Sequence, residues 1–329
     1  MSFNRIMLLF TFLLIATALH SQEMQKGFNN LEKGEFAKAE IFFKDILNDY
    51  PDNKTARLCY ARAVGLSSDP EKAKALFEAL LIEYKNDLEI QLNYAESLLW
   101  NKEYDEAKSY YEKLVQENPE NFGALLGFAN TLSNLHEYED ALNMVNRSLT
   151  VSLENPNAMN SRKYIRLGYA NEQLQQRNYQ DALDFLDANL MDYPGDKESL
   201  LNKANLYLIV KDGPSAKAVY NELALNLNDS ILAFNGISLA SHIDEDEKDA
   251  LYFAEKALDL SEKSKDSLSI LSAKERYAQA LIWNAKFKSA RSYIAKLKTT
   301  YPEAAKILAL EDTLVMYTGD LKNCITNYK

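Results

Sequence analysis

The sequence has few of the residues on which catalytic and metal sites depend. Its 329 residues include only 10 glycines, three histidines and two cysteines. So few glycines leave no glycine-rich loop of the kind that cradles a phosphate group. Only His136 and His242 follow residue 21, and neither belongs to a His-Glu-x-x-His pattern or lies near a cysteine. We therefore expect no enzymatic activity, no metal ion and no cofactor.

Basic residues are scarce relative to acidic ones. The chain has 37 Lys and Arg residues against 48 Asp and Glu residues, a net charge of −11 at pH 7. Such a surface repels phosphates, so nucleic acid is a poor partner. The acidic run at residues 244–249 lacks the glycine and the later glutamate of a calcium loop. It precedes a helix expected to begin near Ala250, where carboxylates stabilise a helix N-terminus.

Long apolar runs are absent except at the N-terminus. Arg5 is followed by thirteen mostly apolar residues, Ile6 to Ala18, a run too short to span a bilayer comfortably. This pattern predicts a secretory signal peptide over residues 1–21, cleaved after Ala18 or Ser21. We expect an exported protein, periplasmic or secreted, of a bacterial envelope. No cysteine follows the run, which disfavours a lipid anchor; an uncleaved single-span anchor stays open as the alternative.

The main feature that the sequence does contain is a 34-residue period. An apolar or aromatic residue follows most of the repeating alanines after four positions, and often another after seven, which is one face of a helix. A proline, which cannot continue a helix, lies twelve positions after four of the alanines. The period predicts a helix ending in a turn in each unit. The repeating alanines are Ala39, Ala73, Ala107, Ala141, Ala182, Ala216, Ala250 and Ala290.

A second helix pattern precedes the first one in each unit. Twelve positions before each alanine from Ala73 onward stands another small residue, usually after an aromatic one, as in Tyr94-Ala95 and Phe128-Ala129. Facing small residues let two helix backbones approach closely. The 34-residue period, the two small-residue patterns and the terminal proline together resemble the tetratricopeptide repeat. This resemblance implies an all-α, right-handed superhelical solenoid of antiparallel helix pairs, although the family's tryptophan is absent from the first helices.

The predicted solenoid covers residues 22–329, with about eight full repeats and a partial ninth. The step from Ala141 to Ala182 adds seven residues to the period, and we expect each helix beside Pro156 to be about one turn longer, with Asn155 as the N-cap. The step from Ala250 to Ala290 adds six residues around 261–266. The predicted units are 22–53, 54–87, 88–121, 122–162, 163–196, 197–230, 231–270, 271–304 and the partial unit 305–329.

The last unit stops inside its second helix, near Cys324 and Tyr328. An uncapped solenoid end exposes a helix-packing face, so we expect self-association through the C-terminal end. Cys59 and Cys324 belong to units that do not touch in a solenoid, so we expect no disulfide between them. Both are expected to be small buried hydrophobic residues.

The resemblance also implies where a partner binds. In this family the first helices line the concave face, which places two rows of side chains in a groove. Carboxamides can pair with the N–H and C=O groups of an extended peptide, and leucines can contact its apolar side chains. The open alternative is that the asparagines are solvated and the leucines pack between helices. The predicted groove residues are Asn130, Asn171 and Asn205 in one row and Leu92, Leu126, Leu167 and Leu201 in the other.

The predicted function is therefore a non-catalytic protein–protein interaction scaffold of the cell envelope. Its partner is expected to be an extended, partly apolar polypeptide segment. The alternative is a periplasmic docking or spacer arm in an export or outer-membrane assembly machine, for a polysaccharide or an outer-membrane component. Neither hypothesis includes a membrane span beyond the signal peptide.

Overall fold

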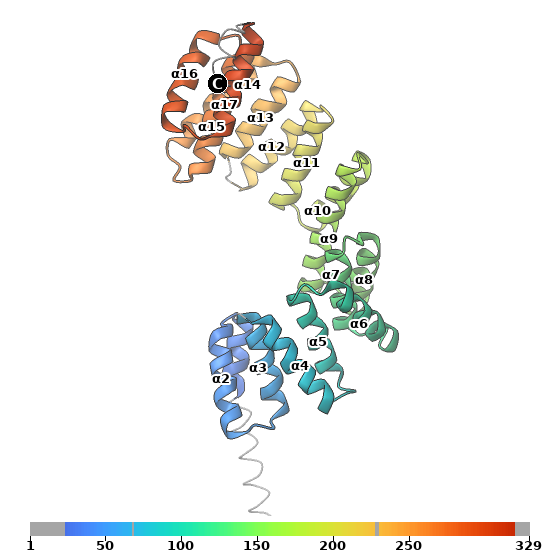
Figure 1. The fold of residues 1–329 in the computed structure, drawn as a ribbon. Helices are drawn as coiled ribbons and strands as arrows, with labels where there is room; N and C mark the ends of the chain where they lie inside the picture. Colours follow the sequence, from blue (N-terminus) through green and yellow to red (C-terminus); the bar gives the residue numbers. More distant parts are fainter. Residues whose placement is uncertain (1–23, 68, 228–229, 320–329) are drawn as a thin grey trace, which may run out of the picture. The chain divides into compact units, whose positions relative to one another are not determined.

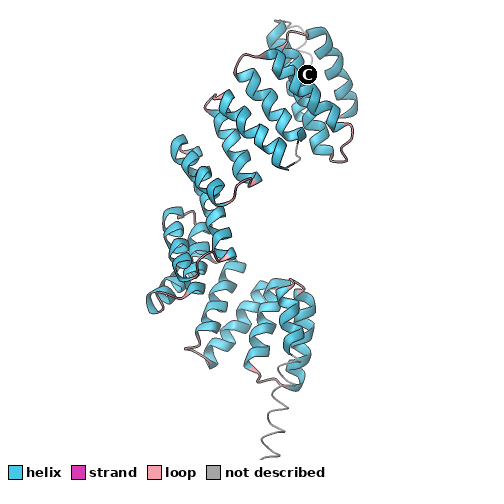
Figure 2. Cartoon of the chain, turned by 180° about the vertical axis from the view of Figure 1, so that it is seen from behind, coloured by secondary structure: helices cyan, strands magenta, loops and turns pink. Residues whose placement is uncertain are grey.

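The chain folds as a series of helices. The computed structural model describes residues 24–67, 69–227 and 230–319. Within these ranges all regular structure is helical and no strand occurs, as Figure 2 shows. The prediction of an all-α fold is confirmed. None of the helices in the described ranges has both the length and the apolar character needed to cross a membrane.

Short turns join neighbouring helices, and most consecutive helices pack against each other (Figure 1). Residues 24–32 are also helical and precede α2. The helices are α2 (Phe36–Asp49), α3 (Lys54–Ser67), α4 (Pro70–Glu83), α5 (Leu88–Trp100), α6 (Tyr104–Glu117), α7 (Phe122–Asn134), α8 (Tyr138–Val151), α9 (Pro156–Gln175), α10 (Tyr179–Asp192), α11 (Lys197–Ile209), α12 (Gly213–Leu227), α13 (Ser230–Ile243), α14 (Glu247–Ser261), α15 (Ser267–Trp283), α16 (Phe287–Thr300) and α17 (Ala305–Thr318).

The chain divides into two compact units. The N-terminal unit extends to Ile165 and the C-terminal unit begins at Arg166, so the boundary falls within α9. Each unit has its own hydrophobic core, around Phe43 in the first and around Ile294 in the second.

The repeating small residues form the centre of each helix pair. Every predicted alanine from Ala39 to Ala290 is fully buried. The small residues of the first helices are 0–2% exposed, which is the close backbone approach that the pattern predicts. A larger side chain at such a position would push the two helices apart. These positions therefore tolerate few residues other than small ones. The first-helix residues are Ala61, Ala95, Ala129, Ala170, Ala204, Ser238 and Ala278.

The turn between the two helices of a pair repeats as regularly as the alanines. In seven of these turns one residue has a positive φ, between 55° and 72°. Its N–H and the next N–H bond back to carbonyls of the preceding helix, as in Lys102 N to Leu99 O (3.0 Å) and Glu103 N to Leu98 O (2.9 Å). This pair of bonds is the Schellman motif that ends a helix. The positive-φ residues of these turns are Gly34, Lys102, His136, Arg177, Lys211, Glu245 and Ala285.

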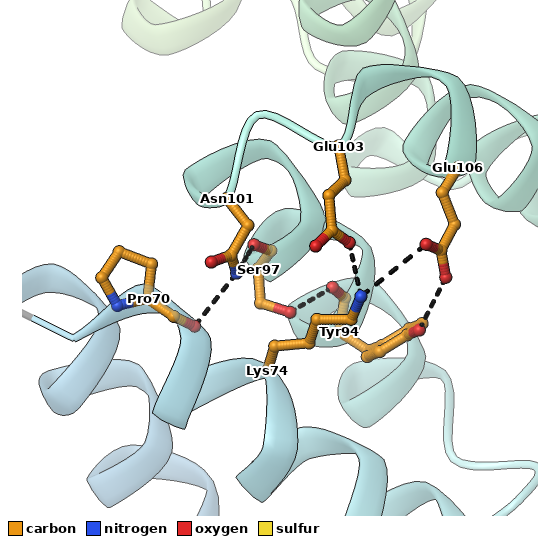
Figure 3. Close-up of polar contacts among 7 residues, drawn as sticks. All are labelled: Pro70, Lys74, Tyr94, Ser97, Asn101, Glu103 and Glu106. Atoms are coloured by element: carbon orange, nitrogen blue, oxygen red, sulfur yellow. Dashed lines mark hydrogen bonds and ion pairs between the residues drawn. The ribbon is translucent and has the colours of Figure 1, made fainter.

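Polar contacts join neighbouring pairs, as Figure 3 shows for the pair α3–α4 and the pair α5–α6. Lys74 of α4 forms ion pairs with Glu103 and, at 3.7 Å, with Glu106 of the following pair. Asn101 donates from Nδ2 to the carbonyl of Pro70 at 3.0 Å. These contacts connect the N-terminal part of α4 with the turn between α5 and α6 and the start of α6.

The same ion pair occurs one repeat later. Lys108 follows Lys74 by one period, and Glu137 follows Glu103 by one period. Lys108 and Glu137 approach to 2.6 Å. Equivalent residues of successive pairs therefore occupy equivalent places.

The first break in the period differs from the prediction. Helix α8 has 14 residues, the same as α6, so it gains no turn. Helix α9 has 20 residues against 13 in α7, so all seven extra residues lie in α9. Seven residues make about two helical turns, which keeps the apolar face in phase. The N-cap prediction is confirmed, because Asn155 Oδ1 accepts the N–H of Asn157 at 3.0 Å.

The second break and the acidic run are close to the prediction. Helix α15 has 17 residues and α14 has 15, so both are longer than most. Asp246 is the N-cap of α14, and its side chain accepts the N–H of Asp249 at 3.0 Å. The capping role predicted for this run is confirmed.

Several predictions concern residues outside the described ranges. The signal peptide at residues 1–21 lies there, as do Cys324, Tyr328 and the second helix of the ninth unit. The predicted self-association through the C-terminal end therefore stays a prediction.

Candidate peptide-binding site

A pocket of about 480 Å³ lies along the first helices of the N-terminal unit. Helices α3, α5 and α7 contact one another in that order and supply most of its walls. The volume is that of a site for one large side chain or a short peptide segment. The lining residues are Arg62, Leu92, Asn93, Glu96, Leu99, Trp100, Tyr111, Gly123, Leu126, Gly127, Asn130 and Asn157.

An ion pair crosses the pocket from one repeat to the next. Arg62 and Glu96 lie one period apart in the sequence and approach to 3.2 Å. Arg62 also donates to Asn93 Oδ1 at 2.9 Å. Burial raises the pKa of Glu96, and the Arg62 guanidinium partly offsets that shift. The positive charge of Arg62 and the negative charge of Glu96 neutralise each other, so the pocket is polar without a large net charge.

The pocket depends on a glycine that makes room for a tyrosine. Tyr111 of α6 is 3% exposed, and its ring lies against the backbone of α7 at Gly127. A Cβ atom at Gly127 would lie 2.3–2.5 Å from three atoms of the Tyr111 ring and hydroxyl, too close for any real contact. Burial raises the pKa of the Tyr111 hydroxyl above its ordinary value.

A tryptophan supplies much of the apolar wall. Trp100, at the end of α5, packs over α3, where a Cβ at Gly65 would lie 2.4 Å from its ring. Leu92 and Leu126 continue this wall on α5 and α7. An aromatic ring beside two leucines favours an apolar ligand group, while the ion pair and carboxamides face polar groups.

Three of the seven predicted groove residues line this pocket: Leu92, Leu126 and Asn130. The carboxamide of Asn130 makes no hydrogen bond to any residue in the described ranges, although its backbone carbonyl accepts from Asn134 at 2.8 Å. A half-buried carboxamide with both its donor and its acceptor unused is available to a ligand.

The other four predicted residues belong to the C-terminal unit. Leu167 is 3% exposed and packs in a core with Ala182 and Leu186, so it is not available to a ligand. Leu201 is half-buried against another core. Asn171 and Asn205 are exposed, and Asn205 accepts a hydrogen bond from the Tyr220 hydroxyl at 3.1 Å.

Sequence reasoning missed the aromatic part of the pocket. A signal was present, because Gly127 follows Tyr111 at the same spacing at which Gly236 follows Tyr220. In both cases the tyrosine ring rests on the glycine of the next pair. The Arg62–Glu96 contact could also be predicted from the sequence, because the two residues have opposite charges and occupy equivalent positions one repeat apart.

The cysteine and metal predictions can be compared with the described ranges. Cys59 is half-buried and free, and burial raises the pKa of its thiol to about 11. A thiol with that pKa is unreactive near neutral pH. No cluster of three or more His, Cys, Asp or Glu side chains able to hold a metal occurs among the residues that the structure describes.

Comparison with known proteins identifies the repeat. A family model described as tetratricopeptide repeat matches residues 66–110 and 101–157. These segments contain α4 to α8, the helices with the repeating ion pair. Residues 66–157 of the chain are therefore similar to tetratricopeptide repeats. No curated protein matches the chain.

Solved structures agree with this fold. The apo form of RapI shares 14% identity with this chain at a TM-score of 0.57, covering 94% of this chain and 99% of RapI. A tetratricopeptide repeat protein from Parabacteroides merdae is 18% identical, with a TM-score of 0.47 and coverage of 79% and 98%. YrrB, whose structure is described as having an unusual peptide-binding site, is 19% identical, with a TM-score of 0.43 and coverage of 60% and 97%. At these identities, the RapI likeness supports the fold alone.

Proposed function

We propose that this protein is a non-catalytic interaction scaffold that binds an extended, partly apolar polypeptide segment along the first helices of its N-terminal unit. The observation that carries the proposal is the pocket formed by α3, α5 and α7, with an apolar wall and an unused carboxamide. Apolar and polar groups occur side by side there, as a peptide with mixed side chains requires.

The two kinds of group have different roles in the proposed complex. One Asn130 hydrogen bond to a peptide backbone contributes about 0.5–1.5 kcal/mol. Micromolar affinity requires about 8 kcal/mol, so hydrogen bonds from this carboxamide are insufficient. At about 25 cal/mol per Å², burying about 200 Å² of apolar surface adds about 5 kcal/mol before the cost of ordering the peptide. The apolar side chain in the pocket therefore dominates affinity, and Asn130 orients the backbone.

We also propose that Asn171 and Asn205 contact polypeptide in the C-terminal unit. Their carboxamides are exposed, although Asn205 must share its oxygen with Tyr220. Leu201 lies half-buried near the start of the same helix as Asn205 and is the apolar candidate there. Changing both asparagines to alanine is expected to weaken every bound peptide by a similar factor.

A fluorescence titration tests the main proposal. The chain has two tryptophans, so Trp283→Phe leaves Trp100 in the pocket as the only one. The probes are synthetic nine-residue peptides that differ only in a central Phe, Leu or Ala. We expect a saturable change in Trp100 emission, with affinity falling in the order Phe, Leu, Ala.

Matched variants separate the two roles. Leu126→Asp should abolish the preference for Phe over Ala, because it places a charge in the apolar wall. Asn130→Ala should weaken all three peptides by a similar factor, about 2- to 13-fold for about 0.5–1.5 kcal/mol. Asn134→Ala on the same helix is the control and should change nothing. Unaltered discrimination in Leu126→Asp would show that the pocket does not select the side chain.

We propose the cell envelope as the place of action, because residues 1–21 have the pattern of a secretory signal peptide. N-terminal sequencing of the cell-associated protein should find a start between Leu19 and Glu23. Intact Met1 on protein recovered from the cytoplasm would contradict export. The docking-arm alternative predicts that the protein co-purifies with a membrane complex and ignores free peptides.

A further inference from the structure

The charge of the chain reverses locally near the C-terminus. Residues 276–302 contain six of the 37 basic residues and none of the 48 acidic ones. Most of this segment is α15 and α16, which pack against each other in the C-terminal unit. In a chain with net charge −11, a stretch of this length without a carboxylate is a surface of distinct chemistry.

Two of the three lysines of α16 are exposed and have no partner in the described ranges. The third, Lys298, forms an ion pair with Glu311 of α17 at 2.7 Å, and Arg291 also has a partner. The side chains of Lys288 and Lys296 are exposed and make no ion pair or hydrogen bond with the residues that the structure describes. Their positive charges therefore remain uncompensated by these neighbouring side chains.

These lysines lie at the edge of a pocket of about 380 Å³. Leu281 of α15 and the rings of Tyr277 and Tyr293 give it an apolar lining. The two tyrosine rings meet edge to face with centroids 5.0 Å apart, which holds them in place. Ser289 and Ser292 add hydroxyl groups on the α16 side, between the two lysines.

The distance between the two lysines determines how far apart the acidic residues of a bound peptide must be. Eight residues of helix separate Lys288 from Lys296, which is about 12 Å along the axis. Four residues of extended chain span about 13 Å, and residues i, i+2 and i+4 of an extended chain point to the same side. An extended peptide lying along α16 can therefore place acidic side chains over both lysines and the residue between them over the pocket.

We propose that this surface binds an extended acidic polypeptide segment with Asp or Glu at positions i and i+4 and an apolar or aromatic residue at i+2. The carboxylates pair with Lys288 and Lys296, and the central side chain enters the pocket beside the contacting rings of Tyr277 and Tyr293. This surface is separate from the pocket of the N-terminal unit, so the inference does not depend on the proposed function above.

Neighbouring acidic residues narrow the choice of partner. Glu255 and Asp259 of α14 act electrostatically on Tyr277, whose pKa is raised first by burial and then by these carboxylates. Negative charge on α14 therefore reaches this pocket, whereas the two lysines lie on α16. A uniformly anionic surface such as a membrane would face these carboxylates as well, and two lysines attract such a surface only weakly. A peptide with two spaced carboxylates and an apolar centre avoids that repulsion.

Fluorescence anisotropy with a dye-labelled peptide tests the proposal. The probe is Ser-Glu-Ser-Phe-Ser-Glu-Ser, and the full chain is titrated into it at low salt. We expect saturable binding that weakens at least 10-fold at high salt, since exposed charge pairs are screened there. Lys288→Glu combined with Lys296→Glu should weaken binding at least 10-fold. Both residues are exposed, so the helical content and melting temperature should stay unchanged.

Controls distinguish this site from general attraction to positive charge. Lys44→Glu combined with Lys85→Glu makes the same charge change at exposed lysines of the N-terminal unit and should leave binding intact. A peptide with its glutamates adjacent, and one with Ala in place of Phe, should each bind at least 10-fold more weakly. Equal binding of the adjacent-glutamate peptide, or equal loss in the control variant, would overturn the proposal. So would binding to phosphatidylglycerol vesicles without binding to the peptide.

Discussion

At the scale of single residues, Gly127 determines whether the candidate pocket can form. A methyl group there would overlap the Tyr111 ring, so the ring or the helix must move. We expect Gly127→Ala to destabilise the protein by about 1–3 kcal/mol, as overpacking does. Gly123→Ala in the same helix is the control: its Cβ would lie 3.3 Å from the flexible end of Leu92. Replacing a helical glycine there should stabilise by up to about 1 kcal/mol. Urea unfolding of the two variants measures both, and equal signs would contradict the packing described.

The pocket glutamate gives a prediction about pH. Burial raises the pKa of Glu96 above its ordinary value of 4.5, so the folded state holds this proton more tightly than the unfolded state. Stability attributable to Glu96 is therefore present below pH 4.5 and is lost as the pH rises through the folded-state pKa. We expect Glu96→Gln to match the wild type near pH 4 and to be more stable than it at pH 7.

Glu83 is the control of opposite sign. Its hydrogen bond to Arg57 lowers the pKa of Glu83, so its contribution is present at pH 7 and is lost as the pH falls through the folded-state pKa. Glu83→Gln should therefore be less stable than the wild type at pH 7. If both variants shifted in the same direction between pH 4 and pH 7, the electrostatic account of Glu96 would be wrong.

At the scale of helices, the left-handed turn residue offers a test of the repeat. Ala285 has a φ of 55° and follows α15 with no polar side chain to stabilise that conformation. The left-handed conformation costs a non-glycine residue about 1–2 kcal/mol, and glycine adds about 0.5–1 kcal/mol of chain entropy to lose. Ala285→Gly should therefore stabilise the protein by up to about 1 kcal/mol.

The control is Ala295→Gly, at an exposed position inside α16, which should destabilise the protein by about 1 kcal/mol. Thermal melts of the pair measure the difference, and a loss of stability in Ala285→Gly would rule out strain at this turn.

Helix lengths show where reasoning from the sequence fails. Pro119 lies in the link between α6 and α7, whereas Pro156 is the first residue of α9. A proline stops one helix or starts the next equally well, so its position alone could not divide the seven extra residues. The side chain of Asn155 decided the outcome by capping α9.

At the scale of the whole chain, the period predicted the fold and only part of the candidate site. Buried alanines recur because two helix backbones approach each other there. Single residues such as Ala107 and Ala129 are enough to show this requirement in the sequence. The pocket is different, since it arises where Tyr111, Trp100 and Arg62 from three helices converge. The register can place a leucine on a first helix, but whether it lines a pocket or a core depends on the neighbouring side chains. Leu126 lines the pocket, whereas Leu167 lies in a core.

The division into two units predicts how damage spreads through the chain. In a repeat protein each helix pair contacts only its neighbours, so a local defect lowers local stability first.

The fluorescence of the two tryptophans reports the unfolding of the two units separately, because Trp100 lies in the first unit and Trp283 in the second. In a Trp283→Phe background, Gly127→Ala should lower the urea midpoint seen by Trp100. In a Trp100→Phe background, the same change should shift the Trp283 midpoint less. Gly236→Ala, whose Cβ would lie 2.3 Å from the Tyr220 ring, is the matched change in the second unit and should give the reverse pattern. If each substitution shifted both midpoints equally, the two units would unfold as one cooperative body, and the boundary within α9 would have no energetic meaning.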